Sequence, residues 1–284
     1  MKTVATQTNA DARTVDGFGD EWERFDQSQL DSREHLALFK KYFKVFPWAK
    51  LPAQAEGFDM GCGSGRWAQL VAPKVGRLHC IDPSSAIHVA KRNLRLQGNC
   101  EFHAAGVADA VLPENSMDFG YSLGVLHHVP DTAEGIKACV RMLKPGAPFL
   151  LYLYYALDNR SVFYRGLWKA SEVIRGAVSA MPHGLRYIVS QAIAGSVYWP
   201  LARLAKFTEA LGFSAAQAAA MPLGFYRHLS FYTMRTDALD RFGTALEQRY
   251  SKAQIHSMMA AAGLRDIVFS DESPYWCAVG HKAH

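Results

Sequence analysis

The stretch that most limits what this chain can fold into is Gly57–Trp67, in which glycines recur at Gly61, Gly63 and Gly65. Its apolar start and its glycine-rich middle predict a buried strand, a tight turn and the beginning of a helix. At such a turn the backbone can approach a nucleotide-type ligand, and helix N–H groups can face it. Asp82 ends a second apolar run roughly 20 residues after the first glycine, where an acid can hold two ribose hydroxyls.

Strand and helix patterns alternate along the first half of the chain. This alternation predicts an α/β fold with a doubly wound, mostly parallel sheet and crossover helices on both faces. A helix and two further strands are expected near the C-terminus. The expected strands are 58–60, 77–81, 100–104, 117–122, 149–155, 265–270 and 276–280, and the expected helices between them are 66–72, 84–96, 136–143 and 251–262.

The alternation of predicted strands and helices, and its interruption after residue 155, divides the chain into four segments. Residues 1–54 are expected to be an N-terminal lid and helical segment that starts with a flexible leader over residues 1–16. Residues 55–155 are the expected cofactor-binding core. Residues 156–248 are helix-rich and too long for a loop, which predicts a helical cap that binds the acceptor. Residues 249–284 would complete the core with a helix and a strand pair.

Composition excludes several classes of protein. The formal charge of +5 is scattered, and no basic stripe indicates a nucleic-acid partner. The five cysteines lack C-x-x-C spacing and lie largely in apolar runs, which is typical of buried thiols in a reducing cytoplasm and implies no metal site. The N-terminus shows no apolar signal region. The uncharged stretch Tyr187–Leu201 is too short for a membrane span and contains Pro200, which also argues against one.

Two residues of the glycine stretch indicate which class of ligand the turn binds. Arg66 stands where the dinucleotide fingerprint has its third glycine, which disfavours a pyrophosphate. Asp59 precedes the first glycine of the turn by two positions, so that its carboxylate would repel a pyrophosphate but attract an ammonium group. The sequence therefore favours a cationic cofactor over NAD.

With these residues in place, the chain resembles the class I S-adenosylmethionine-dependent methyltransferases, in particular the branch that includes quinone-biosynthesis enzymes. The resemblance covers about residues 55–155 and implies a seven-stranded sheet with the cap inserted after the fifth strand. It lies in the segments Asp59–Trp67, Cys80–Ser84, Asn115–Val129 and Leu143–Gly146.

The resemblance also implies positions for the cofactor, S-adenosyl-L-methionine. The first acid and the glycines would contact its methionine part, Asp82 its ribose, and the residue pairs 83–84 and 108–109 its adenine. The end of the fourth strand would border the sulfonium. The implied cofactor-binding residues are Asp59, Gly61, Cys62, Gly63, Gly65, Asp82, Pro83, Ala108, Asp109, Ser122 and Leu123.

Methyl transfer is an in-line displacement that mainly requires positioning of the acceptor and exclusion of water. A general base is needed only where the acceptor loses a proton. His127 and His128 follow the fourth strand at the sheet edge where such folds bind ligands, and Tyr154 ends the fifth. These three are the catalytic candidates, and a structural role for either histidine stays open.

The acceptor is expected to be a small molecule with an oxygen, nitrogen or sulfur nucleophile. Arginines of the cap could clamp an anionic group or pair with Asp158, Asp237 and Asp240 instead. Homodimerisation, peripheral membrane contact, an NAD-type oxidoreductase and a non-catalytic scaffold are left open as alternatives. The candidate acceptor contacts are Trp22, Tyr155, Arg160, Tyr226, Arg227 and Tyr232.

Overall fold

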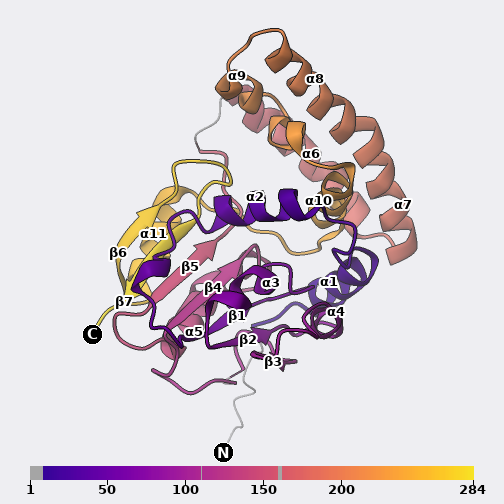
Figure 1. Ribbon diagram of the computed structural model, residues 1–284. Helices are drawn as coiled ribbons and strands as arrows, with labels where there is room; N and C mark the ends of the chain where they lie inside the picture. Colours follow the sequence, from indigo (N-terminus) through magenta and orange to yellow (C-terminus); the bar gives the residue numbers. More distant parts are fainter. Residues whose placement is uncertain (1–8, 110, 159–161) are drawn as a thin grey trace, which may run out of the picture. The chain divides into compact units, whose positions relative to one another are not determined.

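The computed structural model describes residues 9–109, 111–158 and 162–284, which form an α/β fold around a seven-stranded sheet (Figure 1). The strand order is β3-β2-β1-β4-β5-β7-β6. The first five strands are parallel, and β7 runs antiparallel to both of its neighbours. The strands are β1 (Glu56–Met60), β2 (Arg77–Ile81), β3 (Cys100–His103), β4 (Phe119–Leu123), β5 (Pro148–Tyr152), β6 (Leu264–Phe269) and β7 (Ala278–Lys282). The expected doubly wound, mostly parallel seven-stranded sheet is confirmed.

The centre of the sheet packs through two glycines that each face an aromatic ring. A methyl group on Gly57 would lie 2.3 Å from Cε1 of Phe119, and one on Gly120 would lie 2.2 Å from Cζ of Phe58. Both rings are fully buried. Strands that are covered on both faces read as near-continuous apolar runs, and β4 is buried at all of its positions.

Contacts divide the described residues into two compact units, the first built from those within 9–23, 39–158 and 246–284 and the second from those within 24–38 and 162–245. In the first unit, Asp131 accepts from the Glu134 N–H at 2.9 Å, so α5 begins four residues before the expected start at 136. Ser251 and Gln254 form a capping box that starts the last helix where it was expected. The helices are α1 (Ala12–Arg24), which ends in the second unit, α3 (Ala68–Val71), α4 (Ala86–Asn93), α5 (Thr132–Met142) and α11 (Lys252–Ala261).

The N-terminal segment differs from its expectation. α1 begins at Ala12, so the flexible leader expected over residues 1–16 is wrong for its last five residues. Asp11 explains the start, because its Oδ1 accepts from the backbone N–H of Thr14 at 2.8 Å and so caps the first turn. α2 (Ser32–Tyr42) lies within the segment 1–54, which was expected to be a lid and helical segment.

The second unit is helical, as the cap segment predicts. Its own small core lies between α6, α10 and the helical run from α7 to α8, and contains Val178, Tyr198, Met234 and Phe242. Among the residues that the structure places, no helix is long and apolar enough to cross a membrane. The elements are α6 (Val162–Ser179), α7 (His183–Ile193), the π-helical turn η4 (Ala194–Tyr198), α8 (Trp199–Ala210), α9 (Ala215–Ala220), the 3₁₀ turn η5 (Gly224–His228) and α10 (Phe231–Gly243).

Candidate functional site

The glycine turn joins β1 to α3 and uses three left-handed residues. Gly61, Gly63 and Gly65 have φ angles of 78°, 52° and 78°, a region that L side chains rarely adopt. A methyl group on Gly61 would lie 2.3 Å from a methyl group of Val125. The Gly61 N–H donates to the Ile81 carbonyl at 2.8 Å, which ties the turn to the end of β2. The spacing of the glycines is therefore required by backbone geometry at each position.

Asp59 lies at the end of β1 directly before this turn. Its side chain is 1 % exposed, and no group in the described part of the chain forms a hydrogen bond with Oδ2. Burial raises the pKa of the Asp59 carboxyl to about 8, the neighbouring Tyr121 hydroxyl lowers it, and the charge of Asp82 raises it further. A buried carboxyl with an unsatisfied oxygen can accept a hydrogen bond from a cationic ligand group, which fits the ammonium of S-adenosylmethionine.

Asp82 follows β2 and is bound into the same turn. Its Oδ2 accepts from the Gly63 N–H at 2.9 Å, and its Oδ1 accepts from the N–H and the hydroxyl of Ser84 at 2.9 and 2.6 Å. Burial raises the pKa of Asp82, while these Ser84 and Gly63 donors lower it. A carboxylate offers about four acceptor positions, so that roughly one is left for a ribose hydroxyl unless Ser84 moves.

A pocket of about 460 Å³ opens beside Asp82. It brings together Pro83, Ala108 and Asp109, three of the residues predicted for the adenine side. The Asp109 Oδ2 accepts from the Gly106 N–H at 2.6 Å, which shapes the loop around the pocket. The pocket is lined by Asn9, Ala10, Ala12, Val15, Asp16, Gly19, Pro83, Ser84, Ser85, Gly106, Ala108 and Asp109.

The α1 side of this pocket was missed by sequence reasoning. Gly19 lies so close to the start of α4 that a methyl group there would be 2.6 Å from the Ser85 hydroxyl oxygen. The available signal was the spacing of Asp11 and Thr14, which marks a helix start within the supposed leader. Trp22, predicted as an acceptor contact, also belongs to α1 and covers the glycine turn, with its Nε1 only 2.9 Å from a methyl group placed on Gly63.

The two histidines lie in the 3₁₀ turn η3 (Leu126–His128) after β4, and both are buried. His128 Nδ1 lies 2.7 Å from the Leu246 carbonyl, so Nδ1 carries the proton in the neutral ring. The His127 ring packs on Tyr154 with ring centroids 3.9 Å apart. No described group forms a hydrogen bond with either of its nitrogens. Burial, followed by the charges of His128 and Arg249, holds the His127 pKa well below its usual value, so the ring stays neutral.

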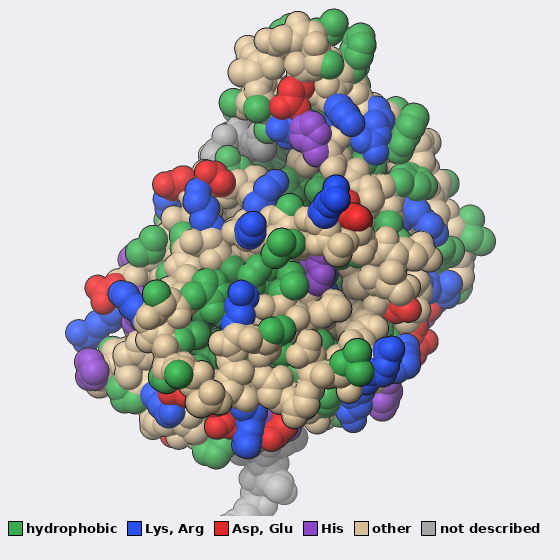
Figure 2. Space-filling model, viewed as in Figure 1, with side chains coloured by type: hydrophobic (Ala, Val, Ile, Leu, Met, Phe, Trp, Pro, Cys, Tyr) green, Lys and Arg blue, Asp and Glu red, His purple; other side chains and the backbone are tan. Residues whose placement is uncertain are grey.

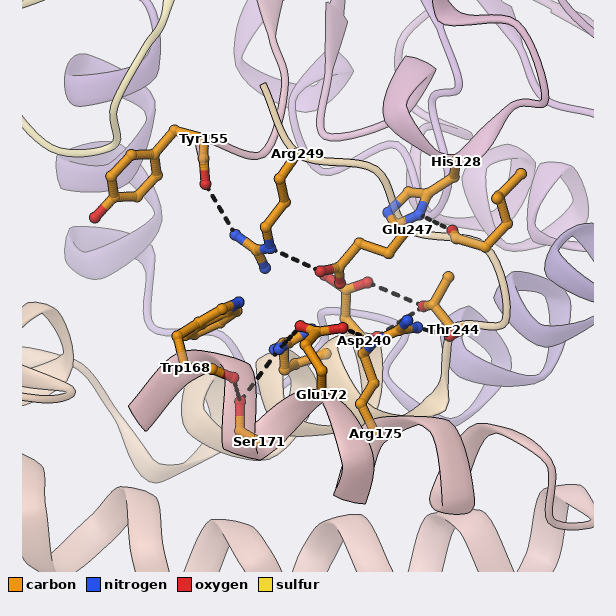
Figure 3. A network of polar contacts seen from close by, with 12 residues as sticks. His128, Tyr155, Trp168, Ser171, Glu172, Arg175, Asp240, Thr244, Glu247 and Arg249 are labelled. Atoms are coloured by element: carbon orange, nitrogen blue, oxygen red, sulfur yellow. Dashed lines mark hydrogen bonds and ion pairs between the residues drawn. The ribbon is translucent and has the colours of Figure 1, made fainter. Parts of the chain in front are cut away.

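Arg249 joins this group, although it was not among the predicted residues. Its guanidinium lies 5.0 Å from the Tyr154 ring centre. It donates to Glu247 at 2.8 Å and to the Tyr155 carbonyl at 3.3 Å (Figure 3). The Tyr155 ring faces Tyr275, at a centroid distance of 5.6 Å. No local motif marks Arg249, because only the return of the chain after the helical segment brings it to the end of β5.

The predicted residues at the end of β4 are buried. The Ser122 hydroxyl donates to the Met60 carbonyl at 3.0 Å and is 0 % exposed, so it links β4 to β1. Leu123 is buried beside it, and Gly124 continues the chain with a φ angle of 77°. The Cys62 side chain is buried in the glycine turn, where burial and the charges of Asp82 and Asp59 raise its pKa to about 11 against the lowering contact with the Cys80 thiol.

The remaining predicted acceptor contacts lie in the second unit. Arg227 Nε donates to Glu209 at 2.9 Å, and Arg235 bonds to Gln191 and Tyr187. The structural alternative to an anion clamp is therefore favoured, although these partners are not the aspartates named for it. The Tyr232 hydroxyl accepts from the Gln27 N–H at 2.9 Å, and the Tyr226 ring packs on Tyr198 at 5.3 Å. Arg160 lies outside the described residues.

Comparison with known proteins matches the glycine-turn region. Residues 58–151 match the family model described as "Methyltransferase domain". A Mycolicibacterium smegmatis protein named "Probable S-adenosylmethionine-dependent methyltransferase" is 28% identical over 156 residues, which are 54% of this chain and 52% of that protein. The ubiquinone biosynthesis O-methyltransferase of Paracidovorax citrulli is 30% identical over 107 residues, 36% of this chain and 43% of that enzyme. The chain thus spans about half the length of these curated relatives or less.

The fold also has counterparts among solved structures. The YcgJ protein from Bacillus subtilis superimposes with a TM-score of 0.51 at 13% sequence identity, over 89% of this chain and 99% of that one. At this identity the likeness concerns the fold.

Proposed function

We propose that this chain, whose residues 58–151 belong to the methyltransferase-domain family, transfers the methyl group of S-adenosylmethionine to a small-molecule acceptor. The observation that carries the proposal is the buried Asp59 carboxyl, which meets no hydrogen-bond partner at Oδ2 among the described residues and ends β1 beside three left-handed glycines. An unsatisfied buried acceptor is costly unless a ligand completes it. A cofactor that combines an ammonium group with a nucleoside supplies that donor.

The residues present fit S-adenosylmethionine along the carboxyl ends of β1 and β2. Asp59 would bind the ammonium, the free acceptor position of Asp82 a ribose hydroxyl, and the pocket of about 460 Å³ beside Pro83 the adenine. When bound, the cofactor supplies an electrophilic methyl group on a positively charged sulfur. Trp22 lies over Gly63, where it can exclude water from the cofactor's amino-acid end.

On the acceptor side, the protein is proposed to orient the acceptor and to accept the proton that its nucleophile loses. The partly exposed Tyr154 can position an acceptor ring, and the buried His127 that packs on it stays neutral because burial lowers its pKa. A neutral imidazole nitrogen can accept the proton that a hydroxyl acceptor loses during attack. An amine or thiol that is already deprotonated needs no such base. The names of the relatives, which include ubiquinone biosynthesis O-methyltransferases, support an oxygen nucleophile as the first class to assay.

Calorimetry and turnover together test the proposal. S-adenosylmethionine should bind to the full chain, whereas NADH should not. Asp59 would repel the pyrophosphate of NADH, and Arg66 occupies the position of the third glycine of the dinucleotide fingerprint. A panel of phenols, amines and thiols is then assayed for release of S-adenosylhomocysteine. NADH binding without S-adenosylmethionine binding would identify an oxidoreductase. Cofactor binding without turnover on any class would support the non-catalytic alternative.

We propose that the helical segment over residues 156–248 selects the acceptor. We also propose that it makes peripheral contact with a membrane. Large apolar side chains on α6, α7 and α8 are exposed, among them Val173, Ile188 and Phe207 at 76%, 63% and 59%. Figure 2 shows hydrophobic side chains at several points of the surface of this helical unit, and exposed apolar side chains of this kind can contact a partner or a lipid surface. Co-sedimentation with phosphatidylglycerol vesicles tests lipid binding, and sedimentation velocity without lipid tests the homodimer.

A further inference from the structure

The three strands at the β3 edge of the sheet bring two histidines and two glutamates together on one face. His79 on β2 pairs in register with Glu101 on β3, and His103 follows two positions later on the same strand. Side chains two positions apart in a strand point to the same face. Glu56 on β1 completes the group from the other side of β2. Residues up to 47 positions apart in the chain, from Glu56 to His103, are thus gathered by strand pairing, and no sequence motif marks them.

The distances between the ligand atoms match a metal site. His79 Nδ1 lies 3.0 Å from His103 Nε2 and 3.4 Å from Glu101 Oε2, and the three atoms all lie within 4.8 Å of one another. Nitrogen and oxygen donors bound to one tetrahedral Zn²⁺ at about 2.0–2.1 Å stand about 3.3 Å apart. Shifts of a few tenths of an ångström to about 1.5 Å would therefore bring all three donors to a common ion.

Glu56 fixes the histidine at the centre of the group. Its Oε1 lies 2.9 Å from His79 Nε2, so that Nε2 carries the proton and Nδ1 presents its lone pair to the other two side chains. Metal-binding histidines typically donate their second N–H to a carboxylate in this way. The His79 side chain is only 6% exposed, which holds the ring in this orientation.

The charges around the group are compatible with a cation. Arg77 contacts Glu101 through Oε1 at 3.3 Å, which leaves Oε2 for the ion, and its own side chain is 53% exposed and can move toward solvent. The simpler reading is a hydrogen-bonded chain from Glu56 through His79 to His103 without any ion.

We propose that His79, Glu101 and His103 bind a divalent transition-metal ion, with Zn²⁺ as the best match, and that Glu56 orients His79 for this site. Two imidazoles and one carboxylate are a ligand set that zinc accepts, with a water completing the tetrahedron. The backbone N–H of Asp82 donates to the carbonyl of His103 at 3.1 Å, so an ion bound here clips together the strand ends that position Asp82.

The experiment titrates the metal-stripped full chain with Zn²⁺ by calorimetry, without any cofactor, so that its outcome is independent of the proposed methyl transfer. One saturable equivalent of Zn²⁺ is expected. Glu101→Gln and His103→Ala should each weaken binding by at least tenfold, and Glu56→Gln should weaken it about 10- to 100-fold, as expected for an orienting carboxylate. Mg²⁺ should not compete, because imidazole suits softer metals.

The matched control is His88→Ala, which removes an exposed histidine of the neighbouring helix α4 and should leave the affinity unchanged. Thermal unfolding separates binding from folding. Zn²⁺ should raise Tm of the unaltered chain and of His88→Ala, but not of Glu101→Gln. Because the Glu101 side chain is exposed, misfolding of Glu101→Gln would not explain the loss of the Tm increase. Co²⁺ should give the absorption bands of a tetrahedral site. Absence of saturable binding, or equal affinity in His103→Ala, would leave the hydrogen-bonded chain as the correct reading.

Discussion

The glycine-turn side and the histidine side of the candidate site are built in different ways. On the glycine-turn side, polar groups are held by backbone N–H groups of the turns that follow β1 and β2, as where Gly63 and Ser84 donate to Asp82. On the histidine side, rings from residues 127, 128 and 154 pack against one another, and the described residues leave both His127 nitrogens without a hydrogen bond. The first side is rigid and locally encoded, whereas the second is assembled by tertiary packing.

The largest effect is expected from Gly61→Ala on the rigid side. The new methyl group would meet Val125 at 2.3 Å, and the φ angle of 78° adds strain of about 1–3 kcal/mol. Cofactor binding should fall below detection and Tm should drop. Calorimetry and thermal unfolding measure both. Gly98→Ala is the control, since nothing lies within 4 Å of a methyl group there. Equal behaviour of the two variants would show that the turn tolerates side chains.

The next largest effect is expected from His127→Phe, which keeps an aromatic ring but removes the nitrogens. For a hydroxyl acceptor, kcat should fall about 100-fold, the lower range for loss of a general base. The affinity for S-adenosylmethionine should stay unchanged, because the change lies on the other side of the site. Since burial lowers the His127 pKa, kcat should not decline through its titration between pH 8 and 6.5. An unaltered kcat would assign His127 a packing role.

Asp59→Asn should weaken the affinity for S-adenosylmethionine about 10- to 100-fold, because a hydrogen bond to a charged group contributes about 1.5–3 kcal/mol. The same substitution should weaken cofactor binding but increase the stability of the cofactor-free protein. The folded-state pKa of about 8 lies above the unfolded value near 3.8, so the cofactor-free protein loses stability as pH rises through this interval. Asn cannot ionise and should remove that loss.

Chemical denaturation at pH 5 and pH 8 checks the second half of the Asp59 prediction. The variant should be more stable than the unaltered chain at both values, and the difference should be several times larger at pH 8, because the unaltered chain begins to lose stability near pH 3.8. A loss of stability at both values would mean that the Asp59 carboxylate is satisfied within the protein.

The smallest effect is expected from Arg227→Ala in the second unit. Its guanidinium already pairs with Glu209 at 2.9 Å and donates to the Gly224 carbonyl at 3.0 Å, so the KM for the acceptor should change less than twofold. Stability should fall by about 1 kcal/mol. A tenfold rise in KM would restore Arg227 as an acceptor contact and would extend the site beyond the two sides compared above.

The difference between the two sides also explains what could be predicted from sequence. The strand at 77–81 and the glycine turn follow from local apolar runs and from φ requirements, and the structure reproduces them. The start of α1 was encoded by Asp11 but was obscured by its polar surroundings.

Other features carry no local signal. Arg249 reaches Tyr154 only because the chain returns to β5 after the helical segment, and the cluster of His79, Glu101 and His103 exists only in the register between β2 and β3. The partners of Arg227 and Arg235 likewise depend on helix packing. The sequence alone therefore does not distinguish an arginine that binds an anionic acceptor from one that is bonded within the protein.

The paired glycines of the central strands have a consequence for how this protein can change over time. Each ring fills the space that a glycine leaves on the neighbouring strand, Phe119 over Gly57 and Phe58 over Gly120. Enlarging one partner is tolerable only if the other shrinks. Across homologous chains, positions 57 and 119 should therefore covary, as should 58 and 120, and single exchanges at these positions should be rare.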